Sequence, residues 1–150
     1  MKILFVCTAN ILRSFMAERI LTEELKKEKK TGIDVSSVAI FDMHGAPADP
    51  TAVEILHEHG LDGAGHHSKL LTEDMVSQSD MIIVMEGIQK KIILEEYPEA
   101  DGKIHLLKSF SPDYNEEYAD IKDPYKLSIF HYRLCYSEIY LAISGLMKCI

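Results

Sequence analysis

Residues 1–14 read MKILFVCTANILRS and decide the fold class of the chain. The run Ile3–Val6 is continuously apolar, which is typical of a strand buried on both faces of a parallel sheet. Turn-forming residues follow it, and from Ser14 to Glu28 the apolar residues recur at helical spacing. The segment is therefore expected to form a buried strand, a short loop and a helix.

The rest of the chain repeats this alternation of apolar runs and helical patterns. Strands are expected at Val35–Ile40, Met81–Met85 and Ile104–Leu107, and further helices at Thr51–His59, Thr72–Ser79, Ile88–Glu96 and Tyr125–Lys148. Strands that alternate with helices predict an α/β fold with a parallel sheet, right-handed crossovers and helices on both faces. Ligands of such sheets bind beyond the carboxyl ends of the strands, and residues 7–13 follow the first of these ends.

Length, composition and charge limit the kinds of protein that this chain can be. Its 150 residues, 47% hydrophobic and 27% charged, predict one globular domain over residues 1–150. The net charge of −8, with no uninterrupted basic run, argues against nucleic acid as a partner. No apolar stretch is long enough for a bilayer, and the N-terminus has no cleavage site, so we expect a cytoplasmic protein with no membrane partner. Three cysteines without CxxC spacing suit a reducing compartment.

Cys7 and Arg13 bracket five residues in the loop that leads from the first strand into the first helix. Backbone N–H groups of such a loop can surround an anion, and the positive end of the helix dipole favours a thiolate at Cys7. An arginine can bind two phosphoryl oxygens at once, so the pair suits in-line phosphoryl transfer to sulfur. The same spacing also arises by coincidence, with Cys7 as a buried apolar residue and Arg13 on the surface. The strand before the loop and the helix after it favour the catalytic interpretation.

Phosphoryl transfer to a thiolate also needs a carboxyl group that first protonates the leaving group and then activates water. Asp123 is the candidate, because Pro124 stiffens its loop and a helix is expected directly afterwards. Asp113 and Asp120 lie nearby in the sequence and compete for this role, and a loop aspartate also commonly caps a helix.

Three segments carry a resemblance to a known family: VCTANILRS at residues 6–14, MAE at 16–18 and DPY at 123–125. The chain resembles the low-molecular-weight protein tyrosine phosphatase family over nearly its whole length. The resemblance implies a four-stranded parallel sheet in the order 2-1-3-4 within three α/β/α layers. It also implies a metal-independent enzyme without a cofactor that hydrolyses protein phosphotyrosine through a phosphocysteine intermediate. The seven histidines have no metal-ligand spacing, so we expect no metal site. The implied partners are phosphotyrosine-containing proteins and a cognate tyrosine kinase, with the enzyme a monomer or a weak dimer.

The resemblance also implies the roles of individual residues. Cys7 would be the nucleophile, Arg13 the phosphate clamp, and Asp123 the general acid and then base. Asn10 would hold the shape of the loop, supported by Ser36 and His66. The residues implied in substrate or phosphate binding are Thr8, Ala9, Asn10, Ile11, Leu12, Ser14 and Tyr125. Among them Ser14 would donate a hydrogen bond to the thiolate, and Tyr125 would stack against an aromatic substrate.

Four positions depart from the family's usual residues. Ala9 replaces a glycine, which makes a positive φ at that position less favourable. Leu12 replaces a second cysteine, so the loop has no thiol with which an oxidised Cys7 could pair. Phe15 replaces a proline and is expected to add to the pocket wall. The aromatic residue usual near Asp42 is missing, and Phe41 is expected to substitute for it.

Several other activities use a similar loop. A protein phosphoarginine phosphatase is one alternative, although the apolar Ile11 favours an aryl phosphate. An arsenate reductase needs further cysteines, and residues 75–100 contain none. A phosphocysteine carrier has no need of Arg13 or of an acid at Asp123. A non-catalytic phosphopeptide-binding module remains the alternative outside catalysis.

Overall fold

The computed structural model describes all residues 1–150 and contains one four-stranded sheet. Its strands are β1 (Lys2–Cys7), β2 (Asp34–Ala39), β3 (Met81–Val84) and β4 (Ile104–Leu106). The spatial order is β2-β1-β3-β4, and every pairing is parallel. The predicted fold class and strand order are therefore confirmed.

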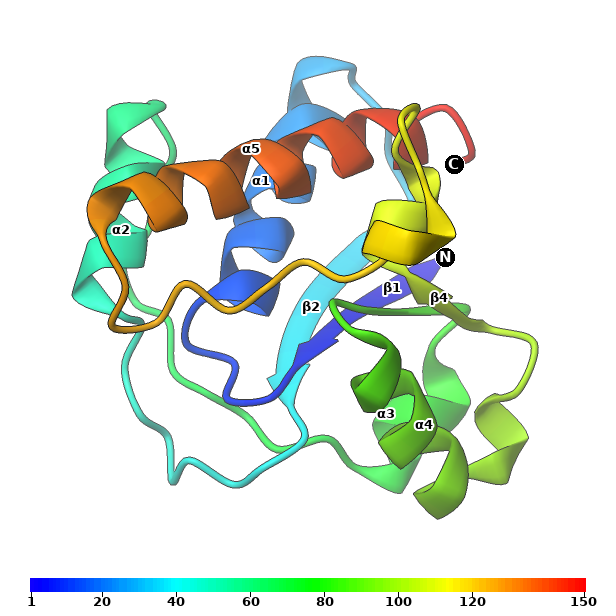
Figure 1. Cartoon of the computed structure of the whole chain (residues 1–150). Helices are drawn as coiled ribbons and strands as arrows, with labels where there is room; N and C mark the ends of the chain where they lie inside the picture. The colour runs from blue at the N-terminus through cyan, green and yellow to red at the C-terminus, as the bar shows by residue number, and fades with distance from the viewer.

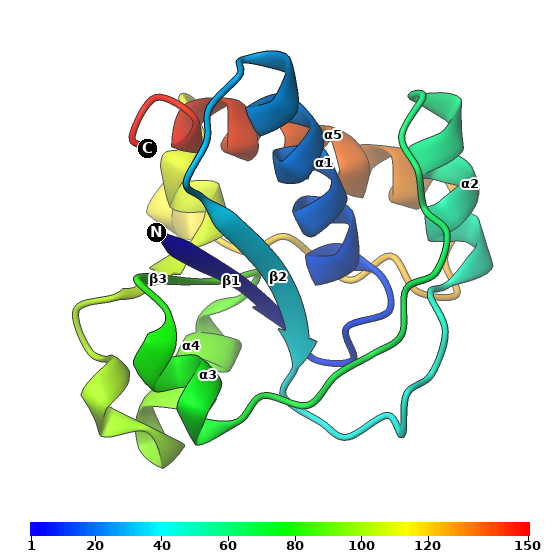
Figure 2. The same cartoon turned by 180° about the vertical axis from the view of Figure 1, so that it is seen from behind.

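Helices cover both faces of the sheet and complete three layers (Figure 1). The helices are α1 (Arg13–Lys27), α2 (Pro50–Glu58), α3 (Glu73–Gln78), α4 (Gly87–Glu96) and α5 (Ile129–Leu146). Helices α1, α2 and α5 lie on one face, and α3 and α4 lie on the other (Figure 2). No helix is both long enough and apolar enough to cross a membrane.

Alternate residues of β1 supply the hydrophobic cores on the two faces of the sheet. Ile3, Phe5 and Cys7 pack among the residues of α1 and α5, whereas Leu4 and Val6 pack with β3, β4 and α4. Side chains of a strand alternate between its faces, which explains why this central strand is apolar throughout. Cys7 ends the strand on the side of α1 and α5.

The chain between β4 and α5 differs from the sequence-based expectation in two ways. Helix α5 begins at Ile129 rather than at Tyr125, because Lys126 has a φ of 63°, in the left-handed region that a right-handed helix excludes. No helix or strand is expected between Leu107 and Tyr125, but the structure has two short 3-10 turns there, Leu107–Phe110 and Glu116–Tyr118. Residues 119–127 are therefore not part of α5, and they pass beside the carboxyl ends of β1 and β3.

Candidate active site

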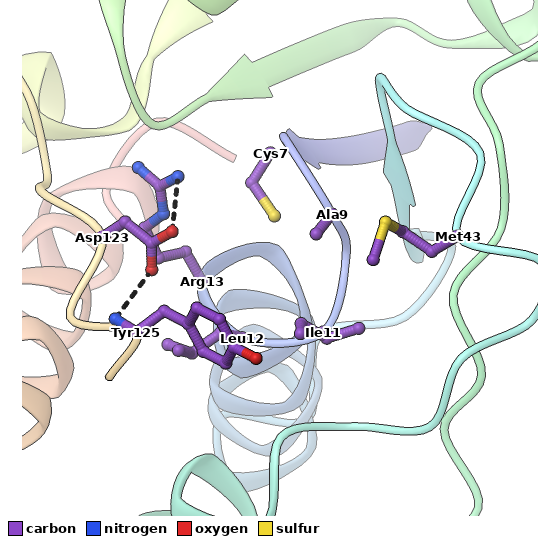
Figure 3. A pocket seen from close by; sticks show the side chains of 8 residues that line it. All are labelled: Cys7, Ala9, Ile11, Leu12, Arg13, Met43, Asp123 and Tyr125. Atoms are coloured by element: carbon purple, nitrogen blue, oxygen red, sulfur yellow. Dashed lines mark hydrogen bonds and ion pairs between the residues drawn. The ribbon is translucent and has the colours of Figure 1, made fainter. Parts of the chain in front are cut away.

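Three segments meet at the carboxyl edge of the sheet: the loop after β1, the turn after β3 and the segment before α5. The loop after β1 and the segment before α5, with Met43 from the loop after β2, line a pocket that holds Cys7, Arg13 and Asp123 together (Figure 3). The remaining lining residues are Ala9, Ile11, Leu12, Met43 and Tyr125. The pocket therefore combines a thiol, a guanidinium and a carboxylate with predominantly apolar walls.

Two hydrogen-bond partners lie next to the sulfur of Cys7, which is almost fully buried. Its Sγ lies 2.9 Å from the Oγ of Ser14 and accepts a hydrogen bond of 3.3 Å from the backbone N–H of Asn10. The side-chain amide of Asn10 donates to the same Ser14 Oγ at 2.9 Å, so that hydroxyl keeps its own proton for the sulfur. Hydrogen bonds of this kind stabilise a thiolate.

The shape of the loop depends on Asn10, which is fully buried and has a φ of 55°. Its side-chain oxygen accepts from the backbone N–H of Lys69 at 3.1 Å, and its backbone oxygen accepts from Nε2 of His66 at 2.6 Å. Asparagine tolerates the left-handed region better than most residues. Ala9 is not among the residues with positive φ, so its Cβ meets no backbone strain there.

Three sequence-based expectations about neighbouring residues are wrong. The amide of Asn10 donates to Oγ of Ser37 at 2.9 Å, whereas Ser36 points to the opposite face of β2 and is exposed. A shift of one residue along a strand exchanges the two faces, which accounts for the error. Phe15 is fully buried and stacks on His66, so it adds nothing to the pocket wall. Met43, and not Phe41, lines the pocket on the facing loop.

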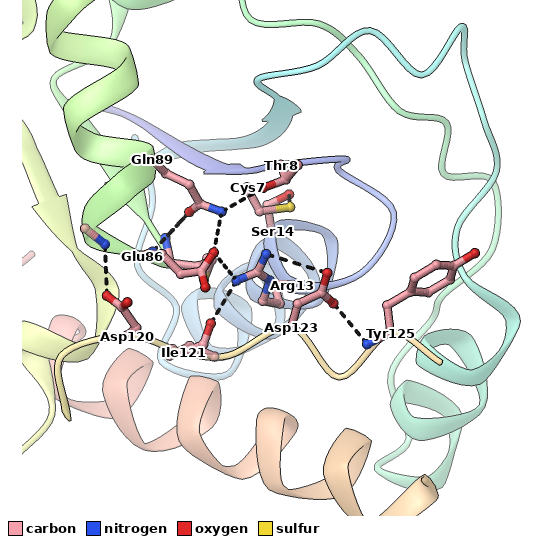
Figure 4. Close-up of polar contacts among 12 residues, drawn as sticks. Cys7, Thr8, Arg13, Ser14, Glu86, Gln89, Asp120, Ile121, Asp123 and Tyr125 are labelled. Atoms are coloured by element: carbon pink, nitrogen blue, oxygen red, sulfur yellow. Dashed lines mark hydrogen bonds and ion pairs between the residues drawn. The ribbon is translucent and has the colours of Figure 1, made fainter. Parts of the chain in front are cut away.

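Arg13 is buried and joins the three segments (Figure 4). Its Nη1 donates to the backbone oxygen of Ile121 at 2.8 Å and lies 3.1 Å from Oε2 of Glu86. Its Nη2 lies 3.9 Å from Oδ2 of Asp123. The other oxygen of Asp123 accepts from the backbone N–H of Tyr125 at 3.0 Å, which turns this carboxylate towards the pocket.

The two competing aspartates are engaged elsewhere. Oδ1 of Asp120 accepts from the backbone N–H of Gly87 at 2.9 Å, at the start of α4. Asp113 accepts a hydrogen bond from the hydroxyl of Ser111. Of the three candidates, Asp123 alone lines the pocket.

Sequence reasoning missed four residues around the site: Ser37, Met43, Glu86 and Gln89. Glu86 could have been predicted, because it comes directly after the predicted strand Met81–Met85 and the carboxyl ends of parallel strands share one edge of the sheet. Met43 and Gln89 carry no comparable signal. No group of three or more His, Cys, Asp or Glu side chains is placed to hold a metal ion.

Comparison with known proteins decides the family. The model of the family described as low molecular weight phosphotyrosine protein phosphatase matches residues 2–150. The chain belongs to this family. It is therefore a cysteine-dependent phosphatase by descent, as the resemblance of the CX5R loop and the Asp-Pro-Tyr segment predicted.

The members of the low molecular weight phosphatase family that resemble this chain include proteins named as tyrosine phosphatases and as arginine phosphatases. The chain is 40% identical to a probable low molecular weight protein-tyrosine-phosphatase, EpsP of Ralstonia nicotianae, over 83% of this chain and 78% of that one. It is 32% identical to the protein-arginine-phosphatase of Geobacillus stearothermophilus, over 98% of this chain and 94% of that one. A solved low molecular weight protein tyrosine phosphatase from T. tengcongensis is 32% identical with a TM-score of 0.91, covering 100% of this chain and 99% of that one.

His66 makes the stability of this family member depend on pH. Burial lowers the pKa of His66, and the charges of Arg19 and Lys69 lower it further, although the hydrogen bond to Asn10 opposes the shift. A histidine whose folded pKa lies below its unfolded value of about 6.5 stabilises the fold only while it is neutral. Its contribution is therefore complete above pH 6.5 and is lost as the pH falls through the lowered folded pKa.

The His66→Gln variant is expected to show a shallower loss of stability with acid than the wild type, because glutamine keeps an N–H donor for Asn10 but does not titrate. Urea unfolding at a series of pH values from 7.5 to 5 measures the two slopes. Parallel curves for the two proteins would show that His66 does not contribute to the acid sensitivity.

Proposed function

We propose that residues 1–150 form one phosphatase domain that hydrolyses protein phosphotyrosine through a phosphocysteine on Cys7. The observation that carries the proposal is the meeting of Cys7, Arg13 and Asp123 in one pocket, although they come from opposite ends of the chain. A nucleophile, an anion clamp and a proton donor are the three groups that this two-step hydrolysis requires.

The first step transfers the phosphoryl group to sulfur. The Cys7 thiolate attacks phosphorus, while the bond from phosphorus to the leaving oxygen breaks. The protonated carboxyl of Asp123 gives its proton to that oxygen, so the tyrosine leaves as a neutral phenol. Backbone N–H groups of the loop and Arg13 stabilise the negative charge on the three remaining oxygens.

The second step returns the enzyme to its starting state. The Asp123 carboxylate takes a proton from a water molecule, whose oxygen attacks phosphorus as the bond to sulfur breaks. Inorganic phosphate leaves, and the electron pair of the broken bond restores the Cys7 thiolate. Ser14 supports both steps, since its hydroxyl proton is free to face the sulfur.

The walls of the pocket favour an aryl phosphate. Ile11 and Met43 present apolar side chains, and Tyr125, which is 48% exposed, offers an aromatic face at the mouth. An aromatic ring gains from stacking and from burial against such walls, whereas a guanidinium would lose hydration without a compensating hydrogen bond to Ile11.

Phosphoarginine is the second candidate substrate, because the Geobacillus protein-arginine-phosphatase matches more of the chain than EpsP does. An arsenate reductase is disfavoured because neither of the other two cysteines lies in the pocket. Cys135 is buried, which raises its pKa to about 12, and Cys149 lies beyond α5. A resolving cysteine must be accessible and readily ionised.

Paired peptides that differ only in carrying phosphotyrosine or phosphoarginine test the substrate class. With EDTA present, we expect kcat/KM to favour phosphotyrosine by about 10-fold or more, the scale on which an apolar pocket discriminates. A preference for phosphoarginine of similar size would assign the second activity instead. Hydrolysis of neither peptide would contradict both assignments.

The natural substrates that follow from this proposal are phosphotyrosine-containing proteins, with a tyrosine kinase as the enzyme that produces them. The three cysteines are free thiols, which is compatible with an enzyme that acts in the reducing cytoplasm. The enzyme is expected to act as a monomer or a weak dimer, because Cys7, Arg13 and Asp123 already meet within a single chain.

A further inference from the structure

Glu86 is placed between the catalytic arginine and the start of α4. It lies two residues after the end of β3, and its side chain is one-quarter exposed. Its Oε2 lies 3.1 Å from Nη1 of Arg13 and 3.4 Å from Nε2 of Gln89, which donates to it. The carboxylate is therefore fixed from two sides.

Gln89 is itself immobilised, because it is almost fully buried and all its polar atoms are engaged. Its Oε1 accepts from the backbone N–H groups of Met85 at 2.9 Å and Glu86 at 3.0 Å. Its Nε2 also donates to Oγ1 of Thr8 at 3.3 Å. The pair Glu86–Gln89 thus contacts the loop at both ends, at Thr8 beside the nucleophile and at Arg13 (Figure 4).

The hydrogen-bond donors of Arg13 show what this contact achieves. A guanidinium has five N–H groups in one plane. The two on Nη1 are directed to the backbone oxygen of Ile121 and to Glu86. The Nε and Nη2 edge remains, with the carboxylate of Asp123 as its nearest anion at 3.9 Å. Because both acceptors of Nη1 are fixed, they set the plane of the Arg13 guanidinium. That plane determines how the Nε and Nη2 edge meets a phosphoryl group.

We propose that Glu86, held by Gln89, is a positioning residue that orients the Arg13 guanidinium for the phosphoryl group in the transition state. The inference rests on the proposed catalytic role of Arg13. Glu86 does not touch the reacting atoms itself. Neighbours that orient a directly acting group commonly contribute a factor of about 10–100 to activity.

A positioning role differs from a purely structural one in what it does to two phosphate-like inhibitors. Orthovanadate adopts the five-coordinate geometry of the transition state, whereas inorganic phosphate resembles the product. A misoriented Arg13 should lower the affinity for vanadate more than the affinity for phosphate, because the alignment of the guanidinium matters most in the transition state. Loss of folded protein would lower both affinities equally.

The test compares Glu86→Ala and Glu86→Gln with Asp120→Asn as a matched control. Asp120 supports the same helix start through Gly87 but makes no contact with Arg13. For Glu86→Ala we expect kcat on an aryl phosphate to fall about 10–100-fold. Vanadate affinity should fall by a similar factor and phosphate affinity much less. Glu86→Gln keeps an oxygen acceptor and should recover part of the loss, while Asp120→Asn should stay near wild type.

Several outcomes would overturn the inference. One is a Glu86→Ala enzyme with the kcat of the Asp120→Asn control, and another is an equal loss of vanadate and phosphate affinity. If Glu86→Ala does not fold, because an arginine buried without its partner is costly, Glu86→Gln decides. A wild-type kcat and vanadate affinity in that variant would then refute the role. A wild-type protein that neither hydrolyses aryl phosphates nor binds vanadate would instead contradict the proposed function, and the positioning role with it.

Discussion

The Cys7→Ser variant is expected to lose turnover of an aryl phosphate by a factor of about 10⁶, the scale seen when an enzyme loses its nucleophile. A serine hydroxyl is far less ionised than a thiol and has no general base beside it here. The backbone N–H groups and Arg13 remain in place, so inorganic phosphate should still bind. Steady-state kinetics with para-nitrophenyl phosphate and calorimetric titration of phosphate measure the two properties separately.

The Cys149→Ser variant is the matched control for this experiment. Cys149 is exposed, lies beyond α5, and is absent from the pocket. It should keep the activity and phosphate affinity of the wild type. Full turnover by Cys7→Ser would exclude a phosphocysteine on this residue, and loss of phosphate binding would show that the substitution had damaged the loop itself.

The Asp123→Ala variant is expected to lose activity in proportion to how poor the leaving group is. Protonation by a positioned acid contributes a factor of about 10²–10⁴. An alkoxide or an unsubstituted phenoxide needs that proton, whereas an acidic nitrophenoxide leaves without it. A series of aryl phosphates with leaving groups of increasing pKa should therefore show a steeper fall in kcat/KM for the variant than for the wild type.

The Asp113→Asn variant provides the comparison for Asp123. Asp113 belongs to the same long connection between β4 and α5 but bonds with Ser111 outside the pocket. Its dependence on the leaving group should match that of the wild type. If Asp123→Ala slows good and poor leaving groups by the same factor, another group supplies the proton.

Much of the fold was predictable from local patterns. A central strand apolar on both faces requires helices on either side, and β1 shows that pattern over Ile3–Val6. The place of the loop after β1 follows from the same reasoning, since ligands of such sheets bind at the carboxyl edge. These features depend on hydrophobic periodicity and chain direction, which are properties of the sequence itself.

The remaining features depend on contacts between distant segments. Ser36 and Ser37 are chemically identical, and only the register of β2 against β1 decides which one meets Asn10. The left-handed backbone of Lys126, which precedes the start of α5, has no glycine or asparagine to indicate it. Met43 reaches the pocket through the path of an irregular loop. None of these can be deduced from spacing along the chain.

The side chain of Arg13 has a consequence for the folding of the enzyme. Its partners are Glu86, after the third strand, and Ile121, close to the last helix. No fragment that lacks one of these segments can hold the guanidinium in place. A nascent or partly unfolded chain therefore exposes a thiol without a competent anion site. We therefore expect hydrolytic activity only from chains in which all three segments have folded together.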